Sequence, residues 1–471
     1  MEPEVFDVVV IGAGPAGEKG ANTAALFGKR VAIVEKGSEV GGAVANTGTL
    51  PSKTLRETAL ALSGLRARNL YGVDLSLRRE ATIADLMHHE RTVTANERAR
   101  IRGYLRILNI QLYQGTAEFV DPHTIRVSND QSQEGSAPEK LLRAEKILIG
   151  TGSSPYRPPE FAFEDTRIHD SDEILALERL PETLAVVGAG VIGSEYACTF
   201  AALGTKVDLI DARDALLPFL DVELSNALLA GMQNLGIVFH WGERVTCEAP
   251  PEGQLLLTLS SGKTLKTDGL LIAAGRSSNT AELNLKAAGI TAGKRGLLTV
   301  NASFQTEVPN IYAAGDVIGF PALAATSMEQ ARVAMCHACD KPYKTEIPNV
   351  LPTGIYTIPE LSTVGETEES LKNKGVEYVV GRARYDQNAR GQIIGDRTGF
   401  LKVLFNSSDM KVLGVHVIGE QASELAHIGL IAMLTGSGAE LFNTACFNYP
   451  TLGDLYKYAA YDAMLKQMAL P

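Results

Sequence analysis

The chain has 471 residues, of which 45% are hydrophobic and 21% charged, and its formal net charge is -11. This length predicts about three globular domains, and the acidic balance argues against a nucleic-acid-binding surface, which needs a basic face. Five irregularly spaced cysteines exclude a secreted disulfide framework. The acidic N-terminus is unlike a secretory signal, and the longest uncharged stretch is too short to span a bilayer. We therefore expect a cytoplasmic protein that binds neither nucleic acid nor membranes.

The first part of the chain predicts a βαβ unit. Residues 5–11 are an apolar run typical of a buried parallel strand, a helix follows the glycine turn to about Gly28, and residues 30–36 form a second strand. Further on, residues 83–108 predict a helix, and residues 110–149 predict strands of a smaller antiparallel sheet.

The turn of this unit carries the spacing of a dinucleotide site, with Gly12, Gly14 and Gly17 in GAGPAG and Glu35 at the end of the next strand. The first glycine allows a tight turn, the second lets the backbone approach a pyrophosphate, and the third lets helix and strand pack closely. The phosphates then lie at a helix N-terminus, and the acid accepts hydrogen bonds from a ribose. The alternative is a glycine-rich packing turn.

Residues 183–211 repeat this pattern, with Gly188, Gly190 and Gly193 in the turn and Asp211 ending the second strand. An acid at this position favours NAD, because it can bind the ribose 2′-hydroxyl. Arg213 follows two residues later and could bind the 2′-phosphate of NADP, or could be a solvated surface arginine. The choice between NAD and NADP therefore stays open.

Cys336 and Cys339 form a CxxC pattern within residues 329–341, which predict a helix. No second pair of cysteines or histidines stands at zinc spacing, so packing is favoured over a metal or redox role, and we expect no metal site. Residues 128–140 predict an exposed loop, and residues 265–275 and 310–316 each predict a strand. From about residue 345 onward we expect a separate C-terminal antiparallel sheet, followed by helices over 421–434 and 453–467.

Residues 41–53 read GGAVANTGTLPSK, and the chain also contains both glycine turns, Ala274-Gly275-Arg276 and Ala314-Gly315-Asp316. Through these motifs it resembles the flavoprotein disulfide reductases, such as lipoamide dehydrogenase and glutathione reductase, over essentially its whole length. The resemblance implies an α/β fold with two Rossmann-like domains, for FAD and NAD(P), and a C-terminal α+β dimerisation domain. The implied boundaries are 1–155 with 278–346 for FAD, 156–277 for NAD(P) and 347–471 for dimerisation.

The two redox cysteines of that family are absent here. They would stand at Val44 and Thr49, and the histidine of the family's His-Pro-Thr segment is replaced by Tyr449, with Asp454 beyond it. Thiol chemistry needs a thiolate and an acid–base partner, and both are missing. In lacking both, the chain resembles the branch of soluble, Si-specific pyridine nucleotide transhydrogenases. Members of that branch often retain a cysteine where this chain has Val44.

By this resemblance, Lys53 lies near flavin N5 and pairs with Glu195; its alternative is a surface lysine. Tyr449 would line the flavin of the partner subunit by packing or hydrogen bonding, since a tyrosine is a poor base near neutral pH. Asp316 would bind the ribityl chain, cap a helix beginning near Leu323, or do both.

The implied catalytic set is thus Lys53, Glu195 and Tyr449. The implied cofactor-binding residues lie in the two glycine turns and the motifs above: Gly12, Gly14, Pro15, Gly17, Glu35, Lys36, Gly41, Gly42, Thr47, Gly48, Lys53, Gly115, Thr116, Ala117, Thr151, Gly152, Gly188, Gly190, Val191, Ile192, Gly193, Glu195, Asp211, Arg213, Gly275, Arg276, Gly315, Asp316, Leu323 and Ala324.

The resemblance implies an FAD-dependent transhydrogenase that takes hydride from NADPH onto flavin N5 and gives it to NAD in a ping-pong reaction, supporting cell redox homeostasis. NAD and NADP would exchange in one pocket of a homodimer, with higher assembly possible. The alternatives are a diaphorase or quinone reductase, a lipoamide dehydrogenase-like protein without dithiol activity, and a nucleotide-binding sensor.

Overall fold

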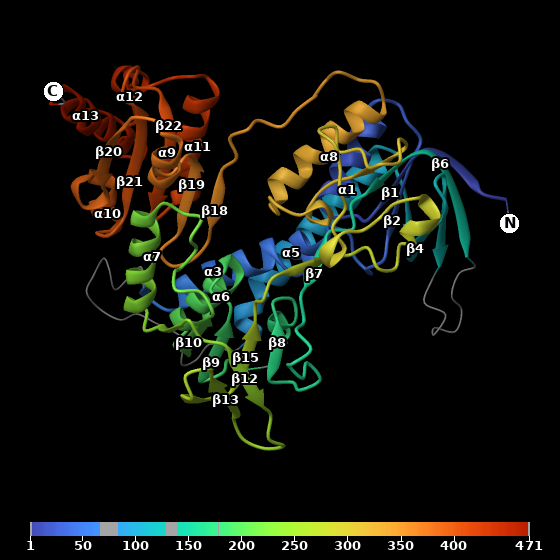
Figure 1. The fold of residues 1–471 in the computed structure, drawn as a ribbon, viewed down its shortest axis with the longest axis horizontal. Coiled ribbons are helices and arrows are strands. Elements are labelled where there is room, and N and C mark those ends of the chain that lie inside the picture. The colour runs from blue at the N-terminus through green and yellow to red at the C-terminus, as the bar shows by residue number, and fades with distance from the viewer. Residues whose placement is uncertain (1, 66–82, 129–138, 178, 470–471) are drawn as a thin grey trace. The chain divides into compact units, whose positions relative to one another are not determined.

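The computed structural model describes residues 2–65, 83–128, 139–177 and 179–469 (Figure 1). The chain divides into two compact units, which we call the first and the second unit. The first unit contains Met1–Thr54, Met87–Tyr156 and Gly275–Ile347, and the second contains Leu55–Leu86, Arg157–Ala274 and Pro348–Pro471. The boundaries between an FAD, a nucleotide and a dimerisation domain stay predictions. The expected loop at 128–140 falls largely outside the described residues.

The first unit is built on a sheet of strand order β3-β2-β1-β6-β5-β4, with β17 pairing β6. The predicted βαβ unit is confirmed: the apolar strands β1 and β2 pair in parallel, with Val8 opposite Val31, and helix α1 connects them. Helix α8 packs against α1, and their alanines, Met335 and Cys339 belong to one hydrophobic core with the sheet (Figure 1). The elements are β1 (Glu4–Ile11), α1 (Pro15–Leu26), β2 (Val31–Glu35), α2 (Gly42–Asn46), α3 (Thr49–Leu62), α5 (Ile83–Ile107), β3 (Gln111–Gln114), β4 (Thr116–Asp121), β5 (Thr124–Ser128), β6 (Lys140–Ile149), β7 (Ser153–Pro155), β16 (Arg276–Ser278), β17 (Ile311–Ala313) and α8 (Ala324–Ala338).

The prediction of a smaller antiparallel sheet over 110–149 is correct for the antiparallel pairing of β4, β5 and β6 and wrong in setting these strands apart from the main sheet. β3 pairs in parallel with β2, and β6 pairs in parallel with β1 over Glu4–Ile11, so both belong to the main sheet. β6 is long enough for two partners on its other edge: its first residues pair antiparallel with β5, and its last pair in parallel with β17. The end of β6, Ile147 to Ile149, is an uninterrupted apolar run that is wholly buried. Such a run in the sequence is typical of a strand that has parallel neighbours, as β6 has in β1 and β17.

The second unit contains a parallel sheet of order β11-β10-β9-β15-β8. The second βαβ unit is confirmed, since α6 connects β9 to β10 and the two strands pair in parallel. The single strand predicted for 265–275 is wrong, because β14 ends before Asp268 and β15 begins after it. Asp268, between the two strands, accepts hydrogen bonds from the backbone N–H and the hydroxyl of Thr183. Before it, β14 belongs to the antiparallel sheet β12-β13-β14, and after it, β15 belongs to the parallel sheet. These elements are β8 (Ile168–Asp170), β9 (Thr183–Val187), α6 (Val191–Ala202), β10 (Lys206–Asp211), α7 (Val222–Asn234), β11 (Val238–Trp241), β12 (Val245–Glu248), β13 (Leu255–Leu259), β14 (Thr264–Thr267) and β15 (Gly269–Ile272).

The expected C-terminal antiparallel sheet is confirmed, with the order β18-β19-β22-β21-β20. Helices α11 and α13, both predicted, pack on it, and Tyr456 and Phe442 are fully buried in the core they share with the sheet. The elements are β18 (Thr353–Ile355), β19 (Leu361–Gly365), α9 (Glu368–Lys374), β20 (Tyr378–Arg384), α10 (Ala389–Ile394), β21 (Phe400–Asn406), β22 (Val412–Ile418), α11 (Ala422–Leu434), α12 (Ala439–Thr444) and α13 (Leu455–Met468).

Two candidate dinucleotide sites

The turn between β1 and α1 requires glycine at two of its three glycine positions. Gly12 has φ +98°, and a Cβ there would lie 2.5 Å from the carbonyl oxygen of Gly150; a Cβ on Gly17 would lie 1.8 Å from the carbonyl oxygen of Gly12. A Cβ on Gly14 would lie 3.7 Å from its nearest neighbour, the Cα of Gly42, which is an ordinary contact. Protein packing therefore does not need a glycine at position 14, whereas a closely approaching pyrophosphate would.

The turn between β9 and α6 has the same geometry. Gly188 has φ +105°, and a Cβ there would lie 2.5 Å from the carbonyl oxygen of Ala273; a Cβ on Gly193 would lie 1.9 Å from that of Gly188. A Cβ on Gly190 would meet no described atom within 4 Å. The middle glycine again faces open space, so the second unit has a second cradle of the same design.

Each turn leads into a helix whose N-terminal amides are available to an anion. Helices α1 and α6 both have a glycine N-cap, Gly14 and Gly190, which provides no capping side chain. The first helical residues are Pro15 in α1 and Val191 and Ile192 in α6. Uncapped N–H groups and the helix dipole favour a bound phosphate at both positions.

The acid that ends each second strand bonds back to its own glycine turn. Glu35 Oε2 accepts from the backbone N of Ala13 at 2.7 Å, and Asp211 Oδ2 accepts from that of Ala189 at 2.6 Å. Burial raises the pKa of Glu35, against the opposing effect of its backbone hydrogen bonds. The two carboxylates thus lie beside the turns, at the position from which an acid of this unit can accept hydrogen bonds from a ribose diol.

Arg213 forms a two-point pair with Asp211. Its Nε lies 2.9 Å from Oδ1 and its Nη2 lies 2.7 Å from Oδ2. Burial would raise the pKa of Asp211, but hydrogen bonds from the Arg213 side chain and backbone hold it below its usual value. A carboxylate and a guanidinium are therefore adjacent at the end of β10, and their binding of a ribose or a phosphate stays a prediction.

Asp316 is held by a chain of polar contacts within the first unit. Ser153 Oγ donates to Asp316 Oδ2 at 2.7 Å, and Arg276 donates through Nε to Ser153 Oγ, also at 2.7 Å. Asp316 does not cap the next helix, because α8 begins at Ala324 with Leu323 as its N-cap residue, so that alternative is wrong. The sequence reasoning missed Ser153, which no motif distinguishes from other serines.

The segment that lacks the two cysteines is organised by an asparagine. Asn46 Nδ2 donates to the carbonyl oxygens of Val40 at 3.2 Å and Gly42 at 2.9 Å, and Arg98 Nε donates to Asn46 Oδ1 at 2.7 Å. Val44 lies in α2 and Thr49 begins α3. Side-chain hydrogen bonds therefore organise the segment, which contains no sulfur.

The neighbouring candidate residues follow the same segment. Gly41 has φ +101°, Thr47 is the C-cap residue of α2, and Lys53 lies in α3 with its Nζ 3.4 Å from Ser52 Oγ. Gly48 donates its backbone N–H to the carbonyl oxygen of Ala43.

Other candidates lie on the connections of the first unit. Gly115 donates its N–H to the carbonyl oxygen of Glu35 at 2.9 Å, just before Thr116 and Ala117 open β4. The buried hydroxyl of Thr151 has no hydrogen-bond partner among the described atoms. An orphaned polar atom next to Gly152, whose φ is +66°, fits a position completed by a ligand.

Lys36 and Gly275 have protein neighbours instead. Lys36 Nζ pairs with Glu282 at the surface, and Gly275, with φ +102°, has the guanidinium of Arg295 3.1 Å from the position of a Cβ. Gly315, with φ +84°, donates its N–H to Gln330.

The three predicted catalytic residues are distributed over both units. Lys53 belongs to the first unit, and Glu195 and Tyr449 belong to the second. Glu195 is 7% exposed and accepts a hydrogen bond from the backbone N of Tyr356 at 2.9 Å. Tyr449 is 76% exposed. The pairing of Lys53 with Glu195 stays a prediction.

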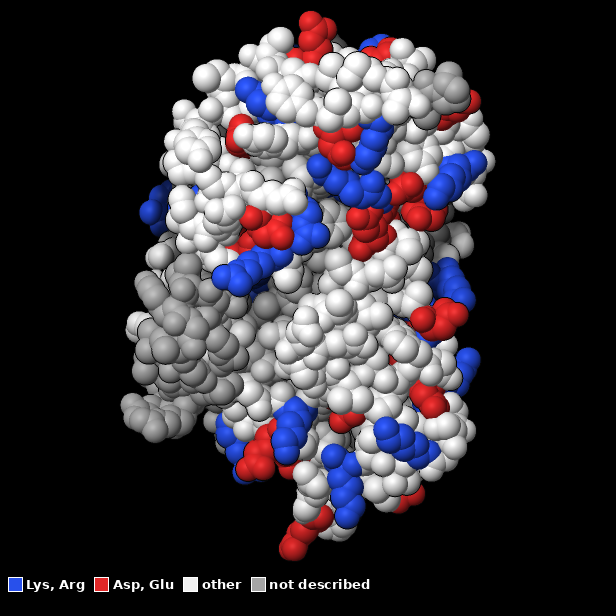
Figure 2. Space-filling view, turned by 90° about the vertical axis from the view of Figure 1, so that its left-hand side faces the viewer, with Lys and Arg blue, Asp and Glu red and all other residues white. Residues whose placement is uncertain are grey.

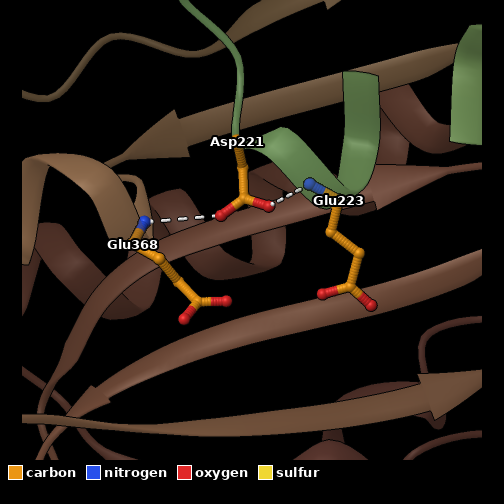
Figure 3. A group of neighbouring side chains, drawn as sticks. All are labelled: Asp221, Glu223 and Glu368. Atoms are coloured by element: carbon orange, nitrogen blue, oxygen red, sulfur yellow. Dashed lines mark hydrogen bonds between the residues drawn. The ribbon is translucent and has the colours of Figure 1, made fainter. Parts of the chain in front are cut away.

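Asp221, Glu223 and Glu368 form the one acidic cluster of metal-binding dimensions among the described residues (Figure 3). A lysine already pairs with all three acids: Lys402 Nζ lies 2.7 Å from Asp221, 3.1 Å from Glu223 and 2.5 Å from Glu368. The site therefore contains an internal ammonium, and we do not interpret it as a metal site.

Comparison with known proteins identifies the family. Residues 6–338 match the pyridine nucleotide-disulphide oxidoreductase family, and residues 351–460 match its dimerisation domain. The chain belongs to this family. It is 46% identical to the soluble pyridine nucleotide transhydrogenase of Mycobacterium bovis, over 99% of this chain and 98% of the relative. It is 41% identical to that of Colwellia psychrerythraea, over 98% of both chains.

The fold agrees with solved members of this oxidoreductase family. LpdA from Mycobacterium tuberculosis superposes with a TM-score of 0.86 at 27% identity, covering 97% of this chain and 99% of that one. The HOCl-induced flavoprotein disulfide reductase RclA from Escherichia coli gives 0.85, also at 27% identity, over 96% and 99%. The predicted α/β oxidoreductase fold with a C-terminal dimerisation domain is confirmed. Within the described residues, no helix combines the length and apolarity needed to cross a bilayer.

Proposed function

We propose that this oxidoreductase is an FAD-dependent pyridine nucleotide transhydrogenase, which moves hydride from NADPH to NAD. The observation that supports this most strongly is the pairing of two complete glycine cradles with a segment that has Val44 and Thr49 where the disulfide reductases have cysteines. A protein with two dinucleotide sites and no dithiol retains electrons on its cofactor. The names of its full-length relatives agree with this function.

The residues of the first unit fit FAD. The amides at the N-terminus of α1 would bind its pyrophosphate beside Gly14, Glu35 would bind the adenosine ribose, and Asp316, fixed by Ser153, would bind the ribityl chain. The orphaned Thr151 hydroxyl would gain a partner. When bound, the flavin supplies a two-electron acceptor and donor of hydride.

The residues of the second unit fit an exchanging nicotinamide dinucleotide. α6 would bind the pyrophosphate beside Gly190, Asp211 would bind the 2′-hydroxyl of NAD, and Arg213 would turn toward the 2′-phosphate of NADP. Lys53 would stabilise negative charge on the reduced cofactor, with Glu195 as its partner. One site that admits both nucleotides requires the first to leave before the second enters.

The active form that we propose is a cytoplasmic homodimer formed through the C-terminal domain, with Tyr449 contributed to the site of the partner subunit. Large apolar side chains are exposed on α11, α12 and α13, an arrangement typical of a surface that another chain covers. They are Ile431, Leu434, Leu441, Tyr458, Tyr461, Met464, Leu465 and Met468. On the face in Figure 2, basic and acidic side chains are interspersed.

The function is tested by steady-state kinetics with NADPH and NAD together. We expect NADH to form, with parallel double-reciprocal lines at several fixed NAD concentrations and retention of si-face stereochemistry with labelled nucleotide. Intersecting lines would indicate two simultaneous nucleotide sites. Faster turnover with a quinone than with NAD would favour a diaphorase.

A further inference from the structure

Residues 356–360 form a hairpin loop in the second unit that several helices hold in place. The loop connects β18 to β19, whose end residues Ile355 and Leu361 pair directly. From α6, Glu195 accepts the backbone N–H of Tyr356 at 2.9 Å, and Cys198 Sγ donates to the carbonyl oxygen of Ile358 at 3.7 Å. The loop therefore sets the position of one carboxylate oxygen of Glu195.

The same loop is bound by a buried arginine from α3. Arg56 is 4% exposed, and its Nε donates to the carbonyl oxygen of Thr357 at 2.9 Å. Its remaining nitrogens face two acids, with Nη1 at 2.6 Å from Glu57 and Nη2 at 3.6 Å from Glu360. A buried guanidinium is costly unless its donors are satisfied, so these contacts fix the side chain in one orientation.

The other sides of the loop are rigid. Glu360 accepts from the backbone N of Ser423 in α11 at 2.8 Å. Pro359 packs so closely on α7 that a Cβ on Gly231 would lie 2.4 Å from its Cδ. Thr357 is fully buried. With three sides fixed, a change at the Arg56 side must shift the peptide groups of Tyr356 and Thr357 themselves.

We propose that Arg56 is a positioning residue for Glu195, acting through the Thr357 carbonyl and the Tyr356 N–H of this loop. Arg56 lies three residues after Lys53 in α3. The proposal rests on the role of Glu195 in the proposed function, and it gives Arg56 a role that acts through the loop.

The test uses Arg56→Lys in the full-length, FAD-loaded protein. Lysine keeps the charge but lacks the planar guanidinium whose Nε, Nη1 and Nη2 contact Thr357, Glu57 and Glu360. The matched control is Arg167→Lys, since Arg167 also binds loop carbonyls in the second unit, Gly253 and Pro250, both at 2.8 Å. Each change is made alone and together with Glu195→Gln, and amide hydrogen exchange over residues 355–361 is measured beside the kinetics.

We expect Arg56→Lys to lower kcat about 10-fold while KM for NADPH changes less than about 3-fold, since misplacement of a catalytic group affects the chemical step. The Tyr356 amide should exchange about 10-fold faster. In the Glu195→Gln background, Arg56→Lys should change the rate by less than about 2-fold, because the two residues act as one unit. Arg167→Lys should show none of these effects, even with a similar loss of Tm.

Several results would overturn the proposal: unchanged exchange at Tyr356, or a full 10-fold loss from Arg56→Lys on top of Glu195→Gln. If Glu195→Gln retains the wild-type rate, Glu195 has no catalytic role and the proposal for Arg56 fails with it. If the wild-type protein does not transfer hydride from NADPH to NAD, the proposed function is wrong, and the exchange at Tyr356 alone then decides whether Arg56 positions Glu195.

Discussion

Lys402 Nζ lies 2.7 Å from Asp221 Oδ1, and both side chains are only 1% exposed. Asp221 is the N-cap of α7, the helix that follows β10, and Lys402 lies in β21 of the C-terminal sheet. This ion pair therefore joins the part of the second unit that contains the β9–α6–β10 glycine turn to the C-terminal sheet. Burial opposes ionisation of both, but their hydrogen bonds keep the pKa of Asp221 lowered and that of Lys402 raised.

Lys402→Met should destabilise the protein by about 3–5 kcal/mol, because it leaves the buried Asp221 carboxylate without its ammonium partner. Urea unfolding at pH 7 measures the loss, and Lys411→Met, which removes an exposed pair with Asp409, should cost less than about 1 kcal/mol. Because the pKa of Asp221 is lowered from its usual value of 3.8, the ion pair stabilises the folded protein fully at pH values above 3.8. This stabilisation is lost as the pH falls below 3.8 and Asp221 becomes protonated.

The acidic cluster around Lys402 makes a second prediction, about metal removal. Because the ammonium occupies the space between the three carboxylates, EDTA should leave both Tm and activity of the wild-type protein unchanged. A Tm that falls with EDTA and recovers with Mg²⁺ or Ca²⁺ would show that the cluster binds a cation after all.

The second and third glycines of the nucleotide turn should fail in different ways. In Gly193→Ala the new Cβ would lie 1.9 Å from the Gly188 carbonyl oxygen, so we expect a loss of about 4 kcal/mol or more in unfolding free energy. Gly190→Ala has space, so its stability should change by less than about 1 kcal/mol while the Kd for NADPH rises at least about 10-fold. Equal nucleotide affinity in Gly190→Ala and wild type would place the pyrophosphate elsewhere.

Arg213→Ala should change the choice of nucleotide. The kcat/KM for NADPH should fall about 10- to 100-fold with loss of the charged partner of the 2′-phosphate, while that for NAD changes less than about 3-fold. The exposed Arg244 provides the control, since Arg244→Ala should affect both nucleotides equally and little. A parallel loss for NAD and NADPH in Arg213→Ala would mean that Arg213 only orders the Asp211 loop.

FAD retention should depend on pH through Glu35. Burial raises the pKa of this carboxyl above its usual 4.5, so it becomes neutral, and loses affinity for a ribose diol, earlier than an exposed glutamate as pH falls. The same raised pKa means that ionised Glu35 reduces the stability of the FAD-free protein as pH rises. Fluorescence of released FAD between about pH 4.5 and 8 measures the effect, and Glu35→Gln should bind FAD more weakly with a flatter pH dependence.

Local patterns allowed the two βαβ units, their glycine turns and their terminal acids to be predicted. Apolar runs identify buried strands, and the third glycine of each turn is required by a contact within the turn itself, Gly17 against Gly12 and Gly193 against Gly188. The C-terminal sheet was predictable from apolar segments of the same kind, although β21 and β22 are buried along most of their length rather than at alternate residues.

The parts that sequence could not predict depend on distant partners. Ser153 and Asp316 are 163 residues apart, and Arg56 and Thr357 are 301 apart, so no local pattern connects them. Lys402 looks like the solvent-facing residue of an alternating strand, yet acids from other elements make it a buried one. The two roles of β6 were missed because pairing with β17 depends on a strand that begins more than 150 residues later along the sequence.

The most direct test of the account is an anaerobic reductive titration of the purified, FAD-loaded protein. With Val44 and Thr49 in place of the two cysteines, the flavin is the only redox centre that we assign, so the account predicts uptake of two electrons per subunit and no reduction of small disulfides. Uptake of four electrons per subunit would reveal a second redox centre and contradict it.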